Sequence, residues 1–279
     1  MISRPNPSSQ RLVSFACAIA AMALPAAAQD AQDPGTQPST PTVAVTLPEA
    51  TILFERHSEA VGGMEALDAF DSRLLTGSFK GADGMSAFVT MYYEKPERFA
   101  VILEIPGMGT INTVYDGDIG WRQAGSNIQI VEGAELVDLI ESADYYGEVN
   151  WKSRYRTIRT VEVGAIEGVQ TFRVAYDSVL GKRGFHFFNN DTGLFVGTQT
   201  TAALGEGQQA IFVQFKDFEE HDGILMPMRI IQQLPGNKVS TFTFNSVDHE
   251  TKRSELFDRP AELERLLEVR KDSAGASDE

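Results

Sequence analysis

Apolar and polar residues alternate at every second position over much of the chain, which is the pattern of strands with one buried face. Short turn signals such as Gly81-Ala82-Asp83-Gly84 and Asp116-Gly117-Asp118 separate these runs. Connections this short join antiparallel neighbours, because a parallel crossover needs about a dozen residues or more. The pattern predicts one large antiparallel sheet, with strands over residues 74–80, 85–93, 98–105, 110–115, 119–123, 127–131, 157–163, 169–176, 184–189, 194–201, 209–218, 224–234 and 238–247.

A few segments repeat their apolar residues at steps of three and four, the spacing of amphipathic helices. The first begins after Pro48 and ends at Gly62-Gly63, and a short helical piece follows over residues 65–70. Residues 134–143 and 260–270 have the same spacing. The chain should therefore be mainly β with few helices.

A sheet of about a dozen strands does not stay open and flat, and it curls into a barrel or splits into a sandwich. The strand from Arg98 is one-sided, since Phe99, Val101, Leu103 and Ile105 share one face. We expect a curled sheet that is apolar inside and polar outside, with two apolar helices available to fill it. A register shift of one residue would exchange the two faces of a strand.

The N-terminus has the pattern of a secretory signal. Arg4 and Arg11 precede an apolar stretch, Leu12 to Leu24, that is too short to span a bilayer, and small residues at 26–28 follow it. A retained membrane anchor is the weaker interpretation. We expect cleavage after Ala28, a flexible leader over 29–47, one domain over 48–270 and a disordered tail over 271–279, in a protein of the periplasm.

Composition narrows the classes of function. The chain has 39 acidic and 24 basic side chains and a formal net charge of -15, which has the wrong sign for nucleic acid. Its one cysteine, Cys17, lies in the predicted signal, and no Cys or His pair has the spacing of metal ligands. We expect no disulfide, metal, cofactor or lipid anchor, and no stable membrane insertion.

No catalytic motif is present. There is no G-x-S-x-G elbow, no His-Glu-x-x-His and no glycine-rich loop between a strand and a helix. The four histidines stand apart in the sequence and fit structural or surface positions. A hydrolase whose residues converge only in space stays open as a minor alternative.

Several segments in order along the chain carry a family resemblance. They are Glu55 to Gly63, Glu94 to Phe99, Ile105 to Gly109, Asp116-Gly117 with Trp121, Asp191 to Leu194, His221 to Pro227 and Leu256-Phe257 near Pro260. Together they make the chain, over about Ile52 to Pro260, similar to the periplasmic outer-membrane lipoprotein-sorting proteins of the LolA/LolB-like superfamily.

That resemblance implies a half-open antiparallel barrel whose helices cover its concave mouth, and a hydrophobic cavity that shields the acyl chains of a lipoprotein. In the family's carriers an arginine before a proline holds this helical lid by hydrogen bonds. The corresponding position here is Lys95-Pro96, so Lys95 is a candidate lid contact with a point charge instead of a planar fork.

The resulting hypothesis is a non-enzymatic periplasmic carrier or chaperone that binds a lipid or lipoprotein acyl chains and meets inner- or outer-membrane sorting partners. The alternative is a structural or interaction module of the cell envelope, with a fully packed barrel and a protein partner. For a carrier, the predicted cavity lining is Met85, Val89, Met91, Phe99, Val101, Leu103 and Ile105, with Leu53, Phe54 and Leu139 on the lid side.

Overall fold

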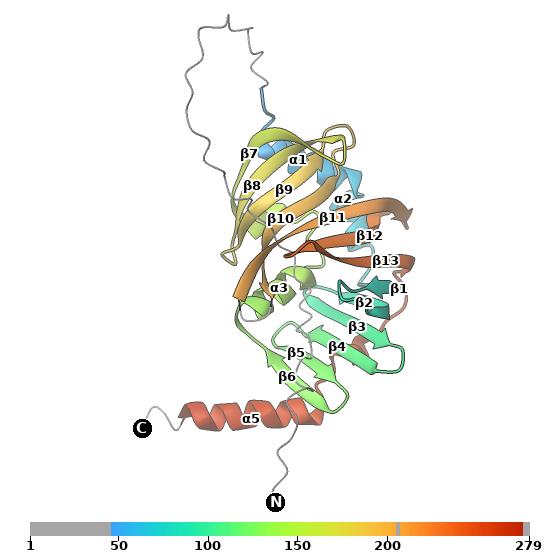
Figure 1. Ribbon diagram of the computed structural model, residues 1–279, viewed down its shortest axis with the longest axis vertical. Coiled ribbons are helices and arrows are strands. Elements are labelled where there is room, and N and C mark those ends of the chain that lie inside the picture. Colours follow the sequence, from blue (N-terminus) through green and yellow to red (C-terminus); the bar gives the residue numbers. More distant parts are fainter. Residues whose placement is uncertain (1–45, 205–206, 276–279) are drawn as a thin grey trace, which may run out of the picture.

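The computed structural model describes residues 46–204 and 207–275. Within these ranges thirteen strands form one sheet, in the order β6-β5-β4-β3-β2-β1-β13-β12-β11-β10-β9-β8-β7 (Figure 1). Every neighbouring pair is antiparallel, and the sheet does not close, since β6 and β7 remain its two edges. The predicted signal at 1–28, and the predicted leader except for residues 46–47, lie outside the described residues.

The strands coincide closely with the alternating runs of the sequence. They are β1 (Ser72–Lys80), β2 (Ser86–Glu94), β3 (Arg98–Ile105), β4 (Gly109–Tyr115), β5 (Gly120–Ala124), β6 (Asn127–Val131), β7 (Tyr155–Ile166), β8 (Val169–Ser178), β9 (Arg183–Asn189), β10 (Phe195–Leu204), β11 (Gly207–His221), β12 (Ile224–Leu234) and β13 (Lys238–Asp248). The predicted fold class, a large curved antiparallel sheet left open with few helices, is confirmed.

Helices precede, divide and follow the strands. They are α1 (Ala50–Ala60), α2 (Gly63–Asp68), α3 (Gly133–Ala143), α4 (Trp151–Arg154), the 3-10 helix η2 (Ser254–Phe257) and α5 (Ala261–Gly275). The short α4 and η2 have no counterpart among the predicted elements. Helix α5 continues five residues beyond the predicted end of the domain at Arg270, so the segment expected to be a disordered tail begins as helix.

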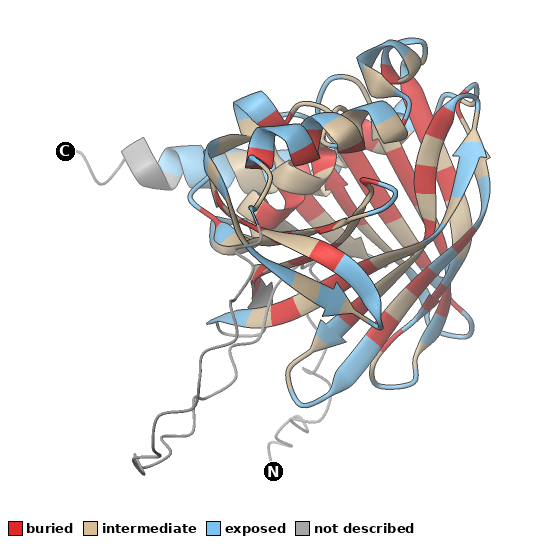
Figure 2. Cartoon of the chain, turned by 90° about the horizontal axis from the view of Figure 1, so that it is seen from above, coloured by how far each residue is buried: buried red, intermediate tan, exposed pale blue. Residues whose placement is uncertain are grey.

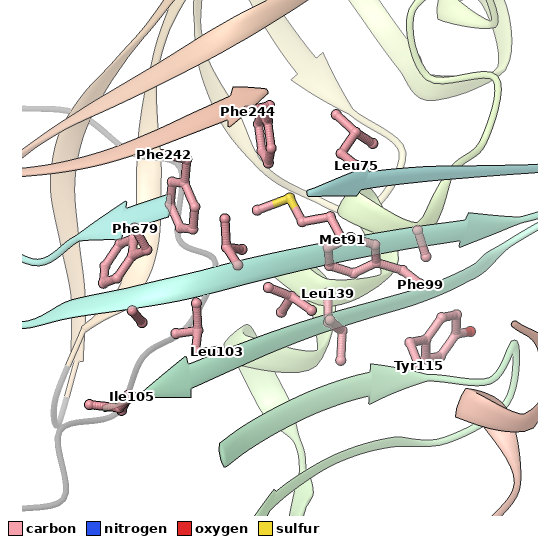
Figure 3. Close-up of a cluster of buried hydrophobic side chains, with 14 of the residues drawn as sticks. Leu75, Phe79, Met91, Phe99, Leu103, Ile105, Tyr115, Leu139, Phe242 and Phe244 are labelled. Carbon is pink, nitrogen blue, oxygen red and sulfur yellow. The ribbon is translucent and has the colours of Figure 1, made fainter. Parts of the chain in front are cut away.

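Helices lie across the hollow side of the curved sheet (Figure 2). Helix α3 packs there against the first half of the sheet, β12 and β13, in a group of buried side chains that we call the α3 cluster (Figure 3). Its side chains come from alternate positions of each strand, as one-sided strands require. They include Leu75, Phe79, Val89, Met91, Phe99, Val101, Leu103, Ile105, Tyr115, Leu139, Phe242 and Phe244.

Helix α1 covers a different part of the sheet. Leu53 and Phe54 pack with Trp151 of α4, Val174 of β8 and Phe188 of β9, and we call this group the α1 cluster. Phe54 and Phe188 meet edge to face, with 4.9 Å between ring centroids. The concave side therefore has two separate apolar groups, one under each half of the sheet.

The outer face is not polar throughout, contrary to the expectation from the sequence. Tyr92, Ala100, Val114 and Trp121 point away from the α3 cluster and are buried, each no more than 3% exposed. The segment that follows β13 covers them with Phe257 of η2 and Leu263 of α5, among others. The C-terminal residues thus form a second layer on the convex side of β2–β5.

The centre of the sheet joins its two sequence halves. Strand β1 pairs with β13, and the register shifts by a bulge between Thr76 and Gly77. At Gly77 the backbones approach so closely that a Cβ atom would lie 2.0 Å from the carbonyl oxygen of Thr243. Only glycine fits that approach without a shift of the backbone.

Candidate functional site

A cavity of about 250 Å³ lies between the concave face of the sheet and the helices. Side chains of both halves of the sheet, of α1 and α3, and of the segment between α3 and β7 line it. It therefore occupies the region where the α3 cluster and the α1 cluster approach each other. One wall is apolar and the other carries several charges.

The apolar wall is rich in rings. Phe195 is central to it, with centroids 5.0 Å from Phe215, 5.8 Å from Phe188 and 4.7 Å from His186. Other apolar side chains on the wall are Phe54, Val61, Leu67, Leu75, Met91, Tyr93, Phe99, Phe218, Ile224, Leu225, Met226, Pro227, Ile230, Phe242 and Phe244. Such a lining suits an apolar ligand fixed by a few polar groups.

The second wall, which we call the polar wall, joins α3 to distant elements by ion pairs. Lys182, in the turn between β8 and β9, lies 2.6 Å from Asp138 and 2.9 Å from Glu141 of α3. Lys182 and Asp138 are almost completely buried. Arg154 of α4 pairs with Asp144 at 3.3 Å and donates a hydrogen bond to the carbonyl oxygen of Glu141. Each of these cations is therefore neutralised within the wall.

His57 links α1 to the same wall. The backbone N–H of Phe195 donates to its Nδ1 at 3.2 Å, so Nε2 carries the proton that is donated to Glu148 at 2.8 Å. Burial acts to raise the pKa of Glu148, but the hydrogen bond from His57 and the charges of Arg73 and Arg154 outweigh it, so this pKa is lowered. Glu148 is therefore held as a carboxylate.

His186 of β9 is buried and neutral. Burial, assisted by the positive charge of Arg154, lowers the pKa of His186 well below its ordinary value. The hydroxyl of Thr198 donates to the carbonyl oxygen of Phe185, so its oxygen accepts the proton of His186 Nδ1 at 3.1 Å. Nε2 then accepts from Tyr155, 2.7 Å away. Burial also raises the pKa of Tyr155, and raises that of Tyr176 to about 12, so both phenols stay protonated.

The residues predicted to line a cavity divide into two groups. Phe54, Met91 and Phe99 are on the cavity surface. Leu53 packs within the α1 cluster instead, and Met85 is partly buried against the α3 cluster. The remaining five, Val89, Val101, Leu103, Ile105 and Leu139, are buried inside the α3 cluster and do not line the cavity. A role of any of the ten in ligand binding stays a prediction.

Lys95 contacts the helical layer. Its Nζ donates to the backbone oxygen of Asp68, the last residue of α2, and to the Oδ1 atom of Asp68, both at 2.9 Å. The same ammonium lies 5.5 Å from the ring centroid of Tyr145 and 5.3 Å from that of Tyr146. Lys95 thus connects β2 to α2 and to the segment after α3, and a function as a lid contact stays a prediction.

Sequence reasoning missed the polar wall. Its carboxylates lie on α3 and just after it, whereas its cations come from elements up to 44 residues away, so sequence spacing gives no sign of their convergence. Arg73 lies one residue before the strand predicted over 74–80. Because β1 begins at Ser72, Arg73 shares a strand face with Leu75 and Phe79 and is a charge on an apolar face.

The described ranges hold no group of three or more His, Cys, Asp or Glu side chains able to bind a metal ion. None of the helices in residues 46–204 and 207–275 combines the length and the apolar character that a membrane span needs.

A scan of protein-family models and a search of curated proteins gave no match. Solved structures do match. A LolA superfamily protein from Nitrosomonas europaea has a TM-score of 0.51 at 12% identity, covering 76% of this chain and 99% of that one. A DUF1329 family protein from Desulfovibrio piger has a TM-score of 0.54 at 12% identity, covering 76% and 98%. The open sheet, the helices on its concave side and these two structures together give the chain a LolA-like fold.

Proposed function

We propose that this protein is a carrier or chaperone of the bacterial periplasm that holds a lipid, or the acyl chains of a lipoprotein, in the cavity between sheet and helices. The observation that carries the proposal is the cavity itself, with its long apolar wall of aromatic and aliphatic side chains. Each methylene that leaves water for such a wall contributes about 0.8 kcal/mol. Burial of an acyl chain therefore needs space and apolar surface, and no chemical step.

Two further observations support the proposal. The sequence resembles lipoprotein-sorting proteins, and the fold matches a LolA superfamily protein. The polar groups of the cavity are mostly paired with one another, as in Lys182 with Asp138 and His57 with Glu148. This pairing fits a structural role better than a hydrolytic one, so the proposed function is non-enzymatic. The partners would be the lipid or lipoprotein cargo and the sorting proteins of the two membranes.

The cavity favours a carrier over the envelope interaction module. That alternative requires a barrel packed solid, whereas here an open volume of about 250 Å³ separates the two apolar clusters.

A fluorescent fatty-acyl probe tests the proposal. Phe215 of β11 lines the cavity and is only partly buried, against Ile211 and Val213, so a lysine at this position places a charge in the path of the ligand. We expect the purified protein to bind the probe and Phe215→Lys to lose at least tenfold in affinity, since a charge in an apolar site is strongly unfavourable.

Phe88→Lys is the matched control. Phe88 is 66% exposed and lies outside the cavity, so this variant should bind like the unmodified protein. No binding by the unmodified protein, or equal affinity of Phe215→Lys and the unmodified protein, would contradict the proposed function.

A further inference from the structure

Arg73 is a buried cation on an otherwise apolar strand face. It lies at the start of β1, is 7% exposed and lines the cavity. Alternation along the strand places it on the same face as Leu75, and its cross-strand neighbour is Tyr93 of β2. From there the apolar wall continues with Leu75, Met91 and Phe99, which lie close together in Figure 3. Arg73 thus stands where the apolar wall of the cavity begins.

The other buried cations of the cavity have carboxylate partners, and Arg73 differs from them. Lys182 contacts two carboxylates and Arg154 contacts one. No hydrogen bond or ion pair joins the Arg73 guanidinium to any residue in 46–204 or 207–275, and its Nε atom is buried without an acceptor. A buried charge without a hydrogen-bond or ion-pair partner destabilises the folded protein, unless a bound anion supplies that partner.

Aromatic faces hold the guanidinium in place. Its Cζ atom lies 4.8 Å from the ring centroid of Tyr93 and 5.3 Å from that of Tyr145. The hydroxyl of Tyr145 donates to the backbone oxygen of Ser72 at 3.4 Å. Ring contacts of this kind orient a guanidinium but accept none of its N–H groups. The fork of donors remains available to a planar oxyanion.

The carboxylates of the cavity do not replace that oxyanion. Asp138 and Glu141 are held by Lys182, Asp144 by Arg154, and Glu148 by His57. The positive charge of Arg73 acts on Glu148 only through space.

We propose that Arg73 binds the anionic head group of an acyl amphiphile, a carboxylate or a phosphate, while the acyl chain lies along Leu75, Met91 and Phe99. This inference rests on the proposed carrier function and adds a ligand class to it: acidic amphiphiles are bound in preference to neutral ones of the same chain length. Arg73 is then the residue that selects and orients the ligand in the cavity.

Displacement of a neutral fluorescent probe by three ligands with the same sixteen-carbon chain tests the inference: hexadecanoate, hexadecyl phosphate and methyl hexadecanoate. In the unmodified protein we expect the better of the two anions to bind at least about tenfold more tightly than the ester, the size of one charge-assisted hydrogen bond. The ranking of carboxylate against phosphate identifies which oxyanion the site prefers. Equal affinity for both anions and the ester would overturn the head-group site without any variant.

Variants separate binding from folding. Arg73→Gln should lose the preference for anions and keep its affinity for the ester, and Arg73→Lys should restore part of the preference. Arg98→Gln, which removes an arginine paired with Glu94 outside the cavity, should behave like the unmodified protein. Equal weakening of acid and ester by Arg73→Gln would show a structural role only. Absence of binding by every ligand would instead overturn the carrier function, and the head-group site with it.

Discussion

The two apolar groups on the concave side of the sheet differ in what they are made of. The α3 cluster is largely aliphatic, with Val89, Val101, Leu103 and Ile105 contributed by adjacent strands. The α1 cluster is built around rings, including Phe54, Trp151 and Phe188. Aliphatic side chains interdigitate to crystal-like packing density. Aromatic rings pair at preferred angles, because each ring has a negative face and a positive edge. Both clusters contribute side chains to the cavity, such as Met91 and Phe99 from the first and Phe54 and Phe188 from the second. The comparison therefore assigns stability mainly to the aliphatic part of the α3 cluster that lies behind the cavity.

We expect the largest loss of stability from the ion pairs that connect α3 to the β8–β9 turn. Lys182 of the β8–β9 turn holds α3 through Asp138 and Glu141, so Lys182→Met leaves two carboxylates without their cation in a buried setting. We expect the free energy of unfolding in urea to fall by about 3–5 kcal/mol.

Lys216→Met is the matched control for this variant. Lys216 pairs with Glu167, which is 58% exposed, and loss of such a surface pair should cost less than about 1 kcal/mol. Similar losses of unfolding free energy in the two variants would mean that the ion pairs of Lys182 stabilise the protein no more than a surface pair does.

A second variant sharpens the division between stability and binding. Leu103 is 6% exposed within the α3 cluster and does not line the cavity. Leu103→Ala should lower the free energy of unfolding by about 3 kcal/mol, through lost apolar burial and a residual void. Affinity for the acyl probe, measured well below the midpoint of unfolding, should not change. A large loss of affinity with little loss of stability would mean that Leu103 contributes to binding and not mainly to the core.

The smallest expected effect is a pH dependence of stability that comes from His186, which lies beside the α1 cluster. The pKa of His186 is lowered in the folded protein. As the pH falls through about 6.5, the His186 side chain therefore becomes protonated in the unfolded chain but stays neutral in the folded protein. The stability from this group is present above about pH 6.5 and falls by at most about 1.4 kcal/mol per pH unit below it.

Urea unfolding between pH 7.5 and 5 measures this slope, and His186→Gln should reduce it. Carboxylates with lowered pKa values, such as Asp116 and Glu148, act at lower pH and do not interfere. An unchanged slope in His186→Gln would show that another group is responsible.

Strands were the most predictable part of this protein. Alternation in the sequence located all thirteen of them within a few residues, because one buried face imposes a period of two. The shared face of Phe99, Val101, Leu103 and Ile105 is also found, in the α3 cluster. Because the turns between sequential strands are short, those strands must pair with each other, and this determines most of the strand order in the sheet.

Long-range neighbours were not predictable from the same patterns. Nothing local places Phe54 of α1 beside Phe188 of β9, or Lys182 beside Asp138. For this reason the predicted lining contains side chains such as Val101 that fill the core, while Phe195, Phe215 and the polar wall were not identified. Residues that share a strand face are known from sequence, but the part of that face left uncovered depends on where each helix packs.

The pairing of β1 with β13 has a consequence for the order of events during synthesis. These central strands are separated by more than a hundred and fifty residues, so the middle of the sheet stays incomplete until the last strand has emerged. Contacts of such long sequence separation slow folding. Until Lys238–Asp248 arrives, β1 and β12 both present open edges that other chains can join. A partly folded chain of this protein therefore risks pairing with its own copies at these two edges until β13 is in place.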